Sequence, residues 1–484
     1  MTLMLDKLKM ADKTGLLIGG EWRSGSGSMA VLDPATETEL AEVATASKAD
    51  AVAAVDAAED AAEEWAATAP RERAEILRRS FELMRENEEA LAELVVMEHG
   101  KSYSDALGEV RYGAEFYRWF SEEAPRIAGE VRTAPGGDKK ILTLVQPVGI
   151  CLLITPWNFP VAMATRKIGP ALAAGCTTIL KPASDTPLSA LAVAHLMEEA
   201  GLPPGVVNVI SARGSSGVTD AILEDTRLRK LSFTGSTEVG RMLLEKASGQ
   251  VLRTSMELGG NAPFVVFEDA DLEAALEGAM VAKMRNAGEA CTAANRFLVH
   301  AAVVDEFSTR LSERMGALKV GPGMDRDNEV GPMINARSRD DIAALVTETL
   351  DGGARALTGG DAPDRPGYFY TPTVLTEVTA DAAILGKEIF GPVAPIVTFE
   401  SEDDAVRIAN DTEFGLMAYV YTEDISRGLR VCERIDSGMI GLNKGLVSDP
   451  AAPFGGLKQS GLGKEGSREG IMEYLDTKYV GLEW

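Results

Sequence analysis

Histidine and cysteine are scarce in this sequence. Its 484 residues include only three histidines, His99, His195 and His300, and four cysteines. No two histidines stand at the spacing of a metal-ligand pair, so the sequence predicts no metal site. Four cysteines in a chain of this length are too few for a disulfide framework and are typical of a reducing compartment. We therefore expect free thiols and a cytoplasmic location.

Basic charge and long apolar runs are also lacking. The 48 Lys and Arg against 74 Asp and Glu give a formal net charge of −26, whereas a protein that binds nucleic acid needs clustered cations to replace phosphate counterions. No run approaches the roughly 20 apolar residues of a membrane-spanning helix, and the N-terminal stretch M-T-L-M-L-D-K-L-K-M has no signal-peptide core. The sequence argues against nucleic acid and membrane partners. A small anionic substrate stays compatible with locally placed cations.

Apolar residues are plentiful, at 45% against 25% charged residues, which is enough for two or three domains. Helical periodicity predicts one helix from Val52 to Trp65, a second from Ile76 to near Gly100 and a third from Leu107 to Phe120. Alternation around P-G-G-D then predicts a hairpin over 128–145. Because such an arm has little to pack on within one subunit, we interpret it as an oligomer contact.

From Gly149 onward, short apolar runs alternate with helical stretches. The runs I-C-L-L-I-T, T-T-I-L-K, V-V-N-V-I and L-S-F predict a parallel sheet with helices on both faces, and a second alternation occupies roughly 258–450. Ligands bind at the carboxyl ends of strands in such sheets. The segments to inspect there are T-P-W-N-F-P, K-P-A-S and T-G-S-T.

Two glycine-rich segments are candidate phosphate sites. Gly461, Gly463 and Gly466 fit G-x-G-x-x-G, but no strand-like run precedes them, so we interpret this segment as a flexible surface turn. Gly235 and Ser236 follow the run L-S-F and open a predicted helix, whose free N–H groups and dipole favour a phosphate. The alternative is that Ser236 merely caps this helix.

Cys291 and Glu257 differ from the other titratable residues in their sequence surroundings. Small residues flank both, in M-E-L-G-G-N and G-E-A-C-T-A-A, and would leave room for a ligand. We expect exposure and a local helix start to lower the pKa of Cys291. The pair is therefore a candidate nucleophile and base, although a lone cysteine of this kind is more often structural. Cys151, Cys176 and Cys432 lie in apolar or mixed surroundings that are typical of buried thiols.

Seven motifs in order carry a resemblance to a known family. T-P-W-N-F-P, L-K-P-A, F-T-G-S-T-x-x-G, M-E-L-G-G-N, G-x-x-C, E-I-F-G-P-V and P-F-G-G-x-K-x-S-G resemble the successive signatures of the aldehyde dehydrogenase superfamily over nearly the full length. The resemblance implies an α/β fold with a Rossmann-type cofactor domain (1–127 and 147–257), a second α/β catalytic domain (258–455), and a β oligomerisation arm with the C-terminal tail (128–146 and 456–484). It also implies a homodimer or homotetramer.

The same resemblance implies the catalytic roles. Cys291 matches the nucleophile that adds to the aldehyde carbon, and the amide of Asn158 with the backbone N–H of Cys291 matches the donors to the oxyanion. After hydride transfer leaves a thioester, Glu257 matches the general base that activates water. Acyl-CoA-forming members tend to lack this base, and a catalytically inactive binding relative would not need all three residues.

Cofactor and substrate residues follow by the same resemblance. Positions that match nucleotide contacts are Trp157, Lys181, Gly235, Ser236, Leu258 and Glu388. NAD-selective members often have a glutamate where this chain has Ser184, so we expect NADP, with NAD as the alternative.

Substrate choice rests on three further positions. Arg166, Arg285 and Ser448 match the substrate residues of succinate-semialdehyde dehydrogenases, which implies an aldehyde with a carboxylate. Glutarate semialdehyde and neutral aldehydes are the alternatives, and each arginine could instead pair with a nearby acid. Ala293 replaces the second cysteine with which some relatives form a redox switch, so no such switch is expected.

Overall fold

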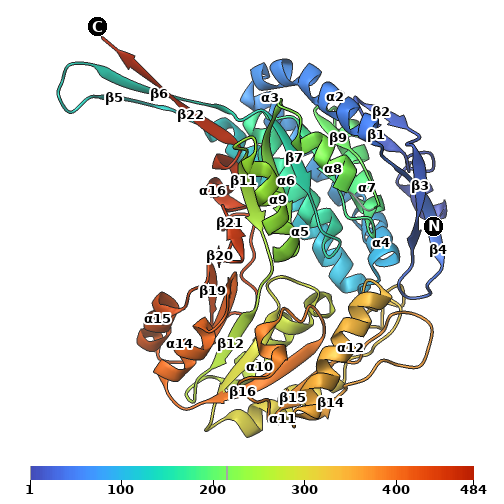
Figure 1. Cartoon of the computed structure of the whole chain (residues 1–484), viewed down its shortest axis with the longest axis vertical. Helices are drawn as coiled ribbons and strands as arrows, with labels where there is room; N and C mark the ends of the chain where they lie inside the picture. Colours follow the sequence, from blue (N-terminus) through green and yellow to red (C-terminus); the bar gives the residue numbers. More distant parts are fainter. Residues whose placement is uncertain (1, 214–215, 484) are drawn as a thin grey trace.

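The computed structural model describes residues 2–213 and 216–483, which form two sheets with helical layers and a protruding arm (Figure 1). The first sheet has eight strands in the order β2-β1-β9-β8-β7-β10-β11-β21. The second has seven, in the order β14-β15-β16-β13-β12-β18-β19. In the first sheet the run β9-β8-β7-β10-β11 is parallel, and in the second sheet the run β15-β16-β13-β12-β18-β19 is parallel. The predicted α/β class is therefore confirmed.

The first sheet and its covering helices occupy the upper part of Figure 1. Its strands are β1 (Leu16–Ile18), β2 (Glu21–Arg23), β7 (Ile150–Ile154), β8 (Thr178–Lys181), β9 (Val207–Val209), β10 (Leu228–Thr234), β11 (Arg253–Glu257) and β21 (Gly461–Leu462). The helices are α2 (Lys48–Ala67), α3 (Pro70–Glu86), α4 (Glu88–His99), α5 (Tyr103–Glu123), α6 (Pro160–Ala174), α7 (Pro187–Glu199), α8 (Ser216–Leu223) and α9 (Thr237–Ser248).

The second sheet occupies the lower part of Figure 1. Its strands are β12 (Ala262–Val266), β13 (Ala294–His300), β14 (Arg355–Thr358), β15 (Thr373–Thr376), β16 (Val393–Phe399), β18 (Met417–Tyr421) and β19 (Met439–Leu442). The helices are α10 (Leu272–Met284), η2 (Arg285–Gly288), α11 (Val304–Gly316), α12 (Ala336–Asp351), α13 (Ala383–Gly386), α14 (Glu402–Asn410) and α15 (Ile425–Arg434).

Smaller elements complete the chain. They are α1 (Thr2–Lys7), the hairpin β3 (Gly27–Leu32) and β4 (Glu39–Thr45), η1 (Ala124–Arg126), the pair β17 (Phe414–Gly415) and β20 (Leu457–Lys458), and α16 (Ser467–Met472). One helix prediction is wrong. The stretch from Ile76 to Gly100 is two helices, because Asn87 leaves helical geometry (φ −110°, ψ 16°) and its side chain binds the Leu83 carbonyl.

Strand register in the first sheet places the ends of several strands side by side. Ile154 pairs with Lys181 across β7 and β8, and with Phe233 across β7 and β10, while Thr234 pairs with Glu257 across β10 and β11. The segments after these strands therefore meet at one edge, as expected for the carboxyl ends of parallel strands.

The glycine-rich tail does not form the predicted surface turn. Gly461 pairs with Glu257 as β21 joins the edge of the first sheet, and a Cβ on Gly461 would lie 1.9 Å from the Met256 carbonyl oxygen. Its positive φ of 134° also favours glycine. This prediction is wrong because the glycines permit close packing against β11, which local sequence does not reveal.

The predicted hairpin forms an arm that stands away from the body, with the C-terminal strand at its edge (Figure 1). Its strands are β5 (Glu130–Thr133), β6 (Lys140–Pro147) and β22 (Leu475–Leu482), in the order β22-β6-β5. Val131, Leu144 and Tyr479 on these strands expose apolar surface to solvent. These apolar side chains of the arm are thus left exposed in a single copy of the chain.

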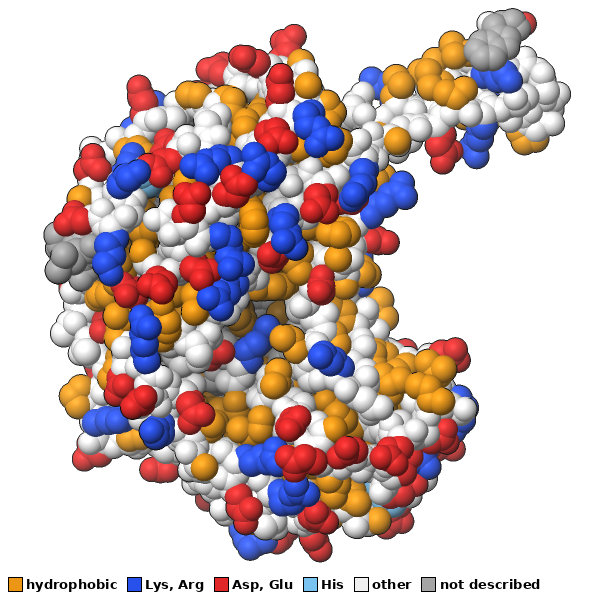
Figure 2. Space-filling view, turned by 180° about the vertical axis from the view of Figure 1, so that it is seen from behind, with side chains coloured by type: hydrophobic (Ala, Val, Ile, Leu, Met, Phe, Trp, Pro, Cys, Tyr) orange, Lys and Arg blue, Asp and Glu red, His pale blue; other side chains and the backbone are white. Residues whose placement is uncertain are grey.

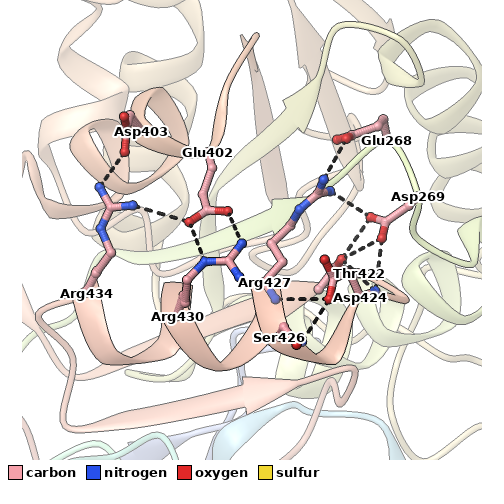
Figure 3. A network of polar contacts seen from close by, with 10 residues as sticks. All are labelled: Glu268, Asp269, Glu402, Asp403, Thr422, Asp424, Ser426, Arg427, Arg430 and Arg434. Atoms are coloured by element: carbon pink, nitrogen blue, oxygen red, sulfur yellow. Dashed lines mark hydrogen bonds and ion pairs between the residues drawn. The ribbon is translucent and has the colours of Figure 1, made fainter.

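Surface charges are largely interspersed. Figure 2 shows acidic and basic side chains mixed over the face that it presents. Figure 3 shows one such network, in which Arg427 of α15 binds Glu268 at 2.9 Å and Asp269 at 3.0 Å. In the same view Arg430 and Arg434 both contact Glu402. The three arginines of this network are therefore matched by acids.

Candidate active site

A cavity of about 230 Å³ lies between the two sheets, where the carboxyl ends of the first sheet face the segment before β13. It brings together eight of the predicted residues: Trp157, Asn158, Gly235, Ser236, Glu257, Leu258, Cys291 and Glu388. The remaining walls come from Pro156, Met163, Thr234, Gly259 and Phe390. Lys181, Ser184, Arg166, Arg285 and Ser448 do not line this cavity and are described below.

Cys291 follows a tight left-handed turn. Asn286 (φ 56°), Ala287 (φ 51°) and Gly288 (φ 79°) form it, and a Cβ on Gly288 would lie 2.2 Å from the Gly391 carbonyl oxygen. Glycine is thus required there, because any side chain would push the cysteine segment out of place.

The pKa of Cys291 is higher than that of an ordinary thiol. Burial is the main cause and raises it to about 12, with the carboxylates of Glu388 and Glu257 adding to the rise and Arg166 and Arg285 opposing it. The predicted lowering is wrong. No helix starts at Cys291, which stands between η2 and β13, and the thiol is half-buried by groups from distant segments.

Glu257 ends β11 with its carboxylate in the cavity. Neither of its oxygens has a hydrogen-bond partner among the described residues. Burial, and next the carboxylate of Glu465, raise its pKa well above the usual range. Glu465 is itself held at 2.6 Å by Lys167, and its pKa is lowered by the nearby cations Lys167 and Arg166 despite burial. A protonatable, unpaired carboxyl group is suited to general base chemistry.

Lys167 and Glu465 were missed by sequence reasoning. Lys167 stands beside Arg166 in R-K-I-G-P. Two adjacent cations in an apolar helix indicate that acid partners lie nearby in the fold, because buried charges need partners. The acid partner lies 298 positions away, so only the fold reveals it.

Asn158 presents its amide to the same cavity. Its Nδ2 donates one hydrogen to the Glu289 carbonyl at 3.1 Å, which leaves the second hydrogen for a ligand. Its Oδ1 is buried without a partner among the described residues. The Asn158 backbone carbonyl accepts from Lys101 Nζ at 2.7 Å and from Asn286 Nδ2 at 3.0 Å.

Arg166 and Ser448 are linked through a residue that sequence reasoning missed. Arg166 Nη2 donates to the Tyr112 hydroxyl at 2.5 Å, and that hydroxyl also hydrogen-bonds Ser448 Oγ. The guanidinium lies 4.1 Å from the Phe454 ring centroid and 3.6 Å from Glu465 Oε2. An acid therefore lies near Arg166, as the alternative interpretation expected, although Glu465 sits closer to Lys167.

Arg285 differs from the paired surface arginines. Its guanidinium lies 5.1 Å from the Phe159 ring centroid. Within residues 2–213 and 216–483 it makes no hydrogen bond or ion pair. The positive charge is thus available to a ligand on the side of Cys291 where Phe159 and Met163 pack against Ala290 and Ala293.

Lys181, Ser184 and Ser236 lie at or just after the ends of strands in the first sheet, whereas Glu388 lies between α13 and β16. Lys181 ends β8, nearly buried, with no partner in the described part of the chain, and burial lowers its pKa to about 8. Ser184 Oγ lies 3.5 Å from Asp185 Oδ2. Ser236 caps α9 through the Val239 N–H, so its capping role is real. Glu388 Oε1 accepts from the Gly260 N–H at 3.0 Å, and burial raises its pKa to about 7.

These features fit a nicotinamide dinucleotide. An unpaired buried ammonium and the N-terminus of the twelve-residue helix α9 offer positive potential to phosphate groups. A Cβ on Gly259 would come within 2.8 Å of Glu388 Oε2, so the backbone is close enough to leave no room for a side chain there. In the described residues no cluster of three or more His, Cys, Asp or Glu is arranged to hold a metal ion.

Comparison with known proteins decides the family. A profile of the aldehyde dehydrogenase family matches residues 22–480. The chain belongs to the aldehyde dehydrogenase family. It is 60% identical to a succinate-semialdehyde dehydrogenase of Paenarthrobacter nicotinovorans, over 92% of this chain and 98% of that protein. It is 47% identical to the succinate-semialdehyde dehydrogenase [NADP(+)] of Escherichia coli (strain K12), over 96% of each.

The family fold is confirmed as well. The crystal structure of succinate-semialdehyde dehydrogenase from Burkholderia pseudomallei superimposes with a TM-score of 0.96 at 45% identity, covering 97% of this chain and 98% of that one. The predicted identity as an aldehyde dehydrogenase is thus correct. None of the helices in the described ranges has the length and apolar character needed to cross a bilayer.

Proposed function

We propose that this chain oxidises succinate semialdehyde to succinate with NADP. The observation that carries the proposal is the pair Arg166 and Arg285, two cations close enough to Cys291 for their charges to lower the pKa of its thiol. Arg285 has no acid partner in the described chain, and Tyr112 links Arg166 to Ser448. A carboxylate in a protein of net charge −26 needs such a local cationic site. The similarity to two succinate-semialdehyde dehydrogenases supports the same substrate.

In this proposal the chemistry begins at Cys291. Its sulfur adds to the aldehyde carbon, and the free hydrogen of Asn158 Nδ2 together with the Cys291 N–H donates to the oxyanion. The addition is needed because an aldehyde carbon is a poor hydride donor until it becomes tetrahedral. Loss of a hydride from this tetrahedral adduct to the bound cofactor would leave a thioester. Glu257 would then take a proton from water, and the resulting hydroxide would release the acid from the thioester.

NADP, when bound, supplies the acceptor for the hydride. Trp157, Gly235, Ser236, Leu258 and Glu388 would hold it at the cavity, all five being wall residues. Lys181 and Ser184 would face the 2′-phosphate, because an unpaired ammonium gains a partner there and serine brings no charge of its own. Asp185 beside Ser184 places a carboxylate nearby, which keeps NAD as an alternative cofactor.

Assembly and organisation follow the same proposal. The division into a cofactor domain, a catalytic domain and an arm with the tail is supported by the two sheets and the separate β22-β6-β5 sheet. The exposed Val131, Leu144 and Tyr479 support the arm as the contact of a homodimer or homotetramer. Four free cysteines are consistent with a cytoplasmic location.

Glutarate semialdehyde is the nearest alternative substrate, because one extra methylene changes binding by only about 1–3 kcal/mol. The test is a kinetic panel of succinate semialdehyde, glutarate semialdehyde, butanal and benzaldehyde, each with NADP and with NAD. We expect the highest kcat/KM for succinate semialdehyde with NADP. A higher value for a neutral aldehyde would overturn the substrate proposal, and no turnover with any aldehyde would indicate an inactive relative.

A further inference from the structure

A buried set of side chains outside the cavity holds the Asn158 loop and the Cys291 segment together. We call Lys101, Asp105, Glu109 and Asn286 the bracing network. Lys101, Glu109 and Asn286 are each at most 3% exposed, and Asp105 is partly buried. None of them lines the cavity, and no step of the proposed mechanism uses them.

Lys101 is the hub of the network. It precedes α5, and its Nζ donates to Glu109 Oε2 at 2.6 Å and to the Asn158 backbone carbonyl at 2.7 Å. The same ammonium lies 4.2 Å from the Phe159 ring centroid. Burial of a charged group is costly without partners, so these contacts stabilise the ammonium in the interior. Two of these three contacts are with the loop that carries the Asn158 amide.

Glu109 holds the other end of that loop. Its Oε1 accepts the backbone N–H of Val161 at 2.8 Å and of Ala162 at 3.3 Å. These N–H groups belong to the first turn of α6, which begins two residues after Asn158 and has no side-chain cap of its own. The carboxylate replaces the missing cap and fixes where the helix starts.

Asp105 and Asn286 extend the network to the cysteine segment. Asp105 Oδ2 accepts the Asn286 N–H at 3.0 Å. Asn286 Nδ2 then donates both to the Asn158 carbonyl at 3.0 Å and to the Glu289 carbonyl at 2.9 Å. The Glu289 carbonyl is also the acceptor for Asn158 Nδ2. Both oxyanion donors, the Asn158 amide and the Cys291 N–H, are therefore tied to one buried frame.

We propose that Lys101 and Glu109 are positioning residues that aim the Asn158 amide at the oxyanion. This inference rests on the proposed function, because it assigns the Asn158 amide to the oxyanion of the aldehyde adduct. Lys101 and Glu109 touch neither substrate nor cofactor. Their effect on turnover passes through Asn158.

Glu98 offers a matched control. On α4 it does for α7 what Glu109 does for α6, since its two carboxylate oxygens accept the Leu188 and Ser189 N–H groups, each at 2.8 Å. It is fully buried as well. Glu98→Gln thus alters a buried carboxylate at a helix start whose hydrogen bonds, among the described residues, go to α7 and not to the Asn158 loop.

The test is a double-mutant cycle in kcat with Asn158→Ala. Removing one oxyanion donor lowers kcat by about 10²–10³-fold, and we expect Lys101→Met to lower it by about 10²-fold. In the Asn158→Ala background, Lys101→Met should cost less than about three-fold, because there is no amide left to aim. Glu98→Gln should lower kcat by the same small factor in the unmodified and the Asn158→Ala backgrounds.

One further readout and one further variant separate positioning from loss of structure. Iodoacetamide alkylates Cys291 without forming an oxyanion, so its rate should stay within about two-fold in every variant. Glu109→Gln keeps the side-chain shape and the bonds to α6 while it breaks the pair with Lys101, so it gives the same cycle if Lys101→Met does not fold.

Each outcome decides the inference. Effects of Lys101→Met and Asn158→Ala that multiply independently would overturn it, and so would an equal fall in the alkylation rate, since the network would then act on the cysteine segment. An unmodified chain that turns over no aldehyde refutes the proposed function and this inference with it. An active chain with independent effects refutes this inference alone.

Discussion

Arg285→Met is the sharpest test of the substrate carboxylate site. The change keeps the apolar length of the side chain over Phe159 and removes a guanidinium that has no ion pair in the described chain. Because no partner acid is left unpaired, the variant should fold normally. The loss of a charged donor should then appear in substrate recognition rather than in stability.

The expected magnitude is that of one hydrogen bond to a charged group. A hydrogen bond to a charged group contributes about 1.5–3 kcal/mol, and each 1.4 kcal/mol or so is tenfold in an equilibrium or rate ratio. We expect kcat/KM for succinate semialdehyde to fall by roughly 10–150-fold. Butanal, in which a methyl group replaces the carboxylate, should lose only a few-fold, because Arg285 also makes a minor contribution that lowers the pKa of Cys291.

The assay is the initial rate of NADPH formation with each aldehyde. Arg427→Met is the matched control, since it removes the same charge from a surface arginine that Glu268 and Asp269 already bind (Figure 3). It should change neither rate by more than about two-fold. An equal loss for butanal and succinate semialdehyde in Arg285→Met would refute the carboxylate site.

Three further predictions concern the cysteine, the base and the cofactor. Cys291→Ala should abolish NADPH formation in the kinetic panel, and undiminished turnover would rule out the thioester route. Glu465→Gln removes a carboxylate that raises the pKa of Glu257, so that pKa falls and the rise of kcat with pH should move to lower pH; a move to higher pH would contradict the assigned cause. Ser184→Glu should raise the KM for NADP by about tenfold or more through repulsion of the 2′-phosphate, while the KM for NAD stays equal or falls; equal changes for both cofactors would place Ser184 elsewhere.

The central strands of the first sheet could be predicted because their sequence pattern is distinctive. Strands that are buried on both faces read as continuous apolar runs, and all five residues of β7 are buried. The polar segments after these runs could therefore be proposed as ligand-binding segments from the sequence alone. The edges of the sheet could not be predicted, since β21 joins β11 across about two hundred intervening residues and its pairing depends on tertiary packing.

The proposed catalytic residues were predicted from motifs, whereas their electrostatic surroundings could not be predicted in this way. Lys101 and the carbonyl of Asn158 are 57 positions apart, so no window of sequence shows their contact. The pKa of Cys291 was predicted in the wrong direction for the same reason. Its small neighbours in sequence suggested exposure, but burial by distant segments and the carboxylate of Glu388 dominate.

The raised pKa of the Cys291 thiol sets a requirement for the proposed mechanism. A thiol with a pKa of about 12 is protonated at neutral pH, so its proton must leave before sulfur adds to the aldehyde. Glu257 lies in the same cavity with both oxygens unpaired in the described chain, and burial raises its affinity for a proton. Once it accepts that proton, Glu257 is neutral and no longer opposes the thiolate.

The proton transfer therefore neutralises one of the two carboxylates that raise the pKa of the Cys291 thiol. The positive charges of Arg166 and Arg285 then stabilise the Cys291 thiolate. Burial of Glu257 thus has two consequences for the reaction. It makes the carboxylate a stronger base than an exposed one, first toward the thiol and, once Glu257 has released that proton to solvent, toward the water that releases the acid.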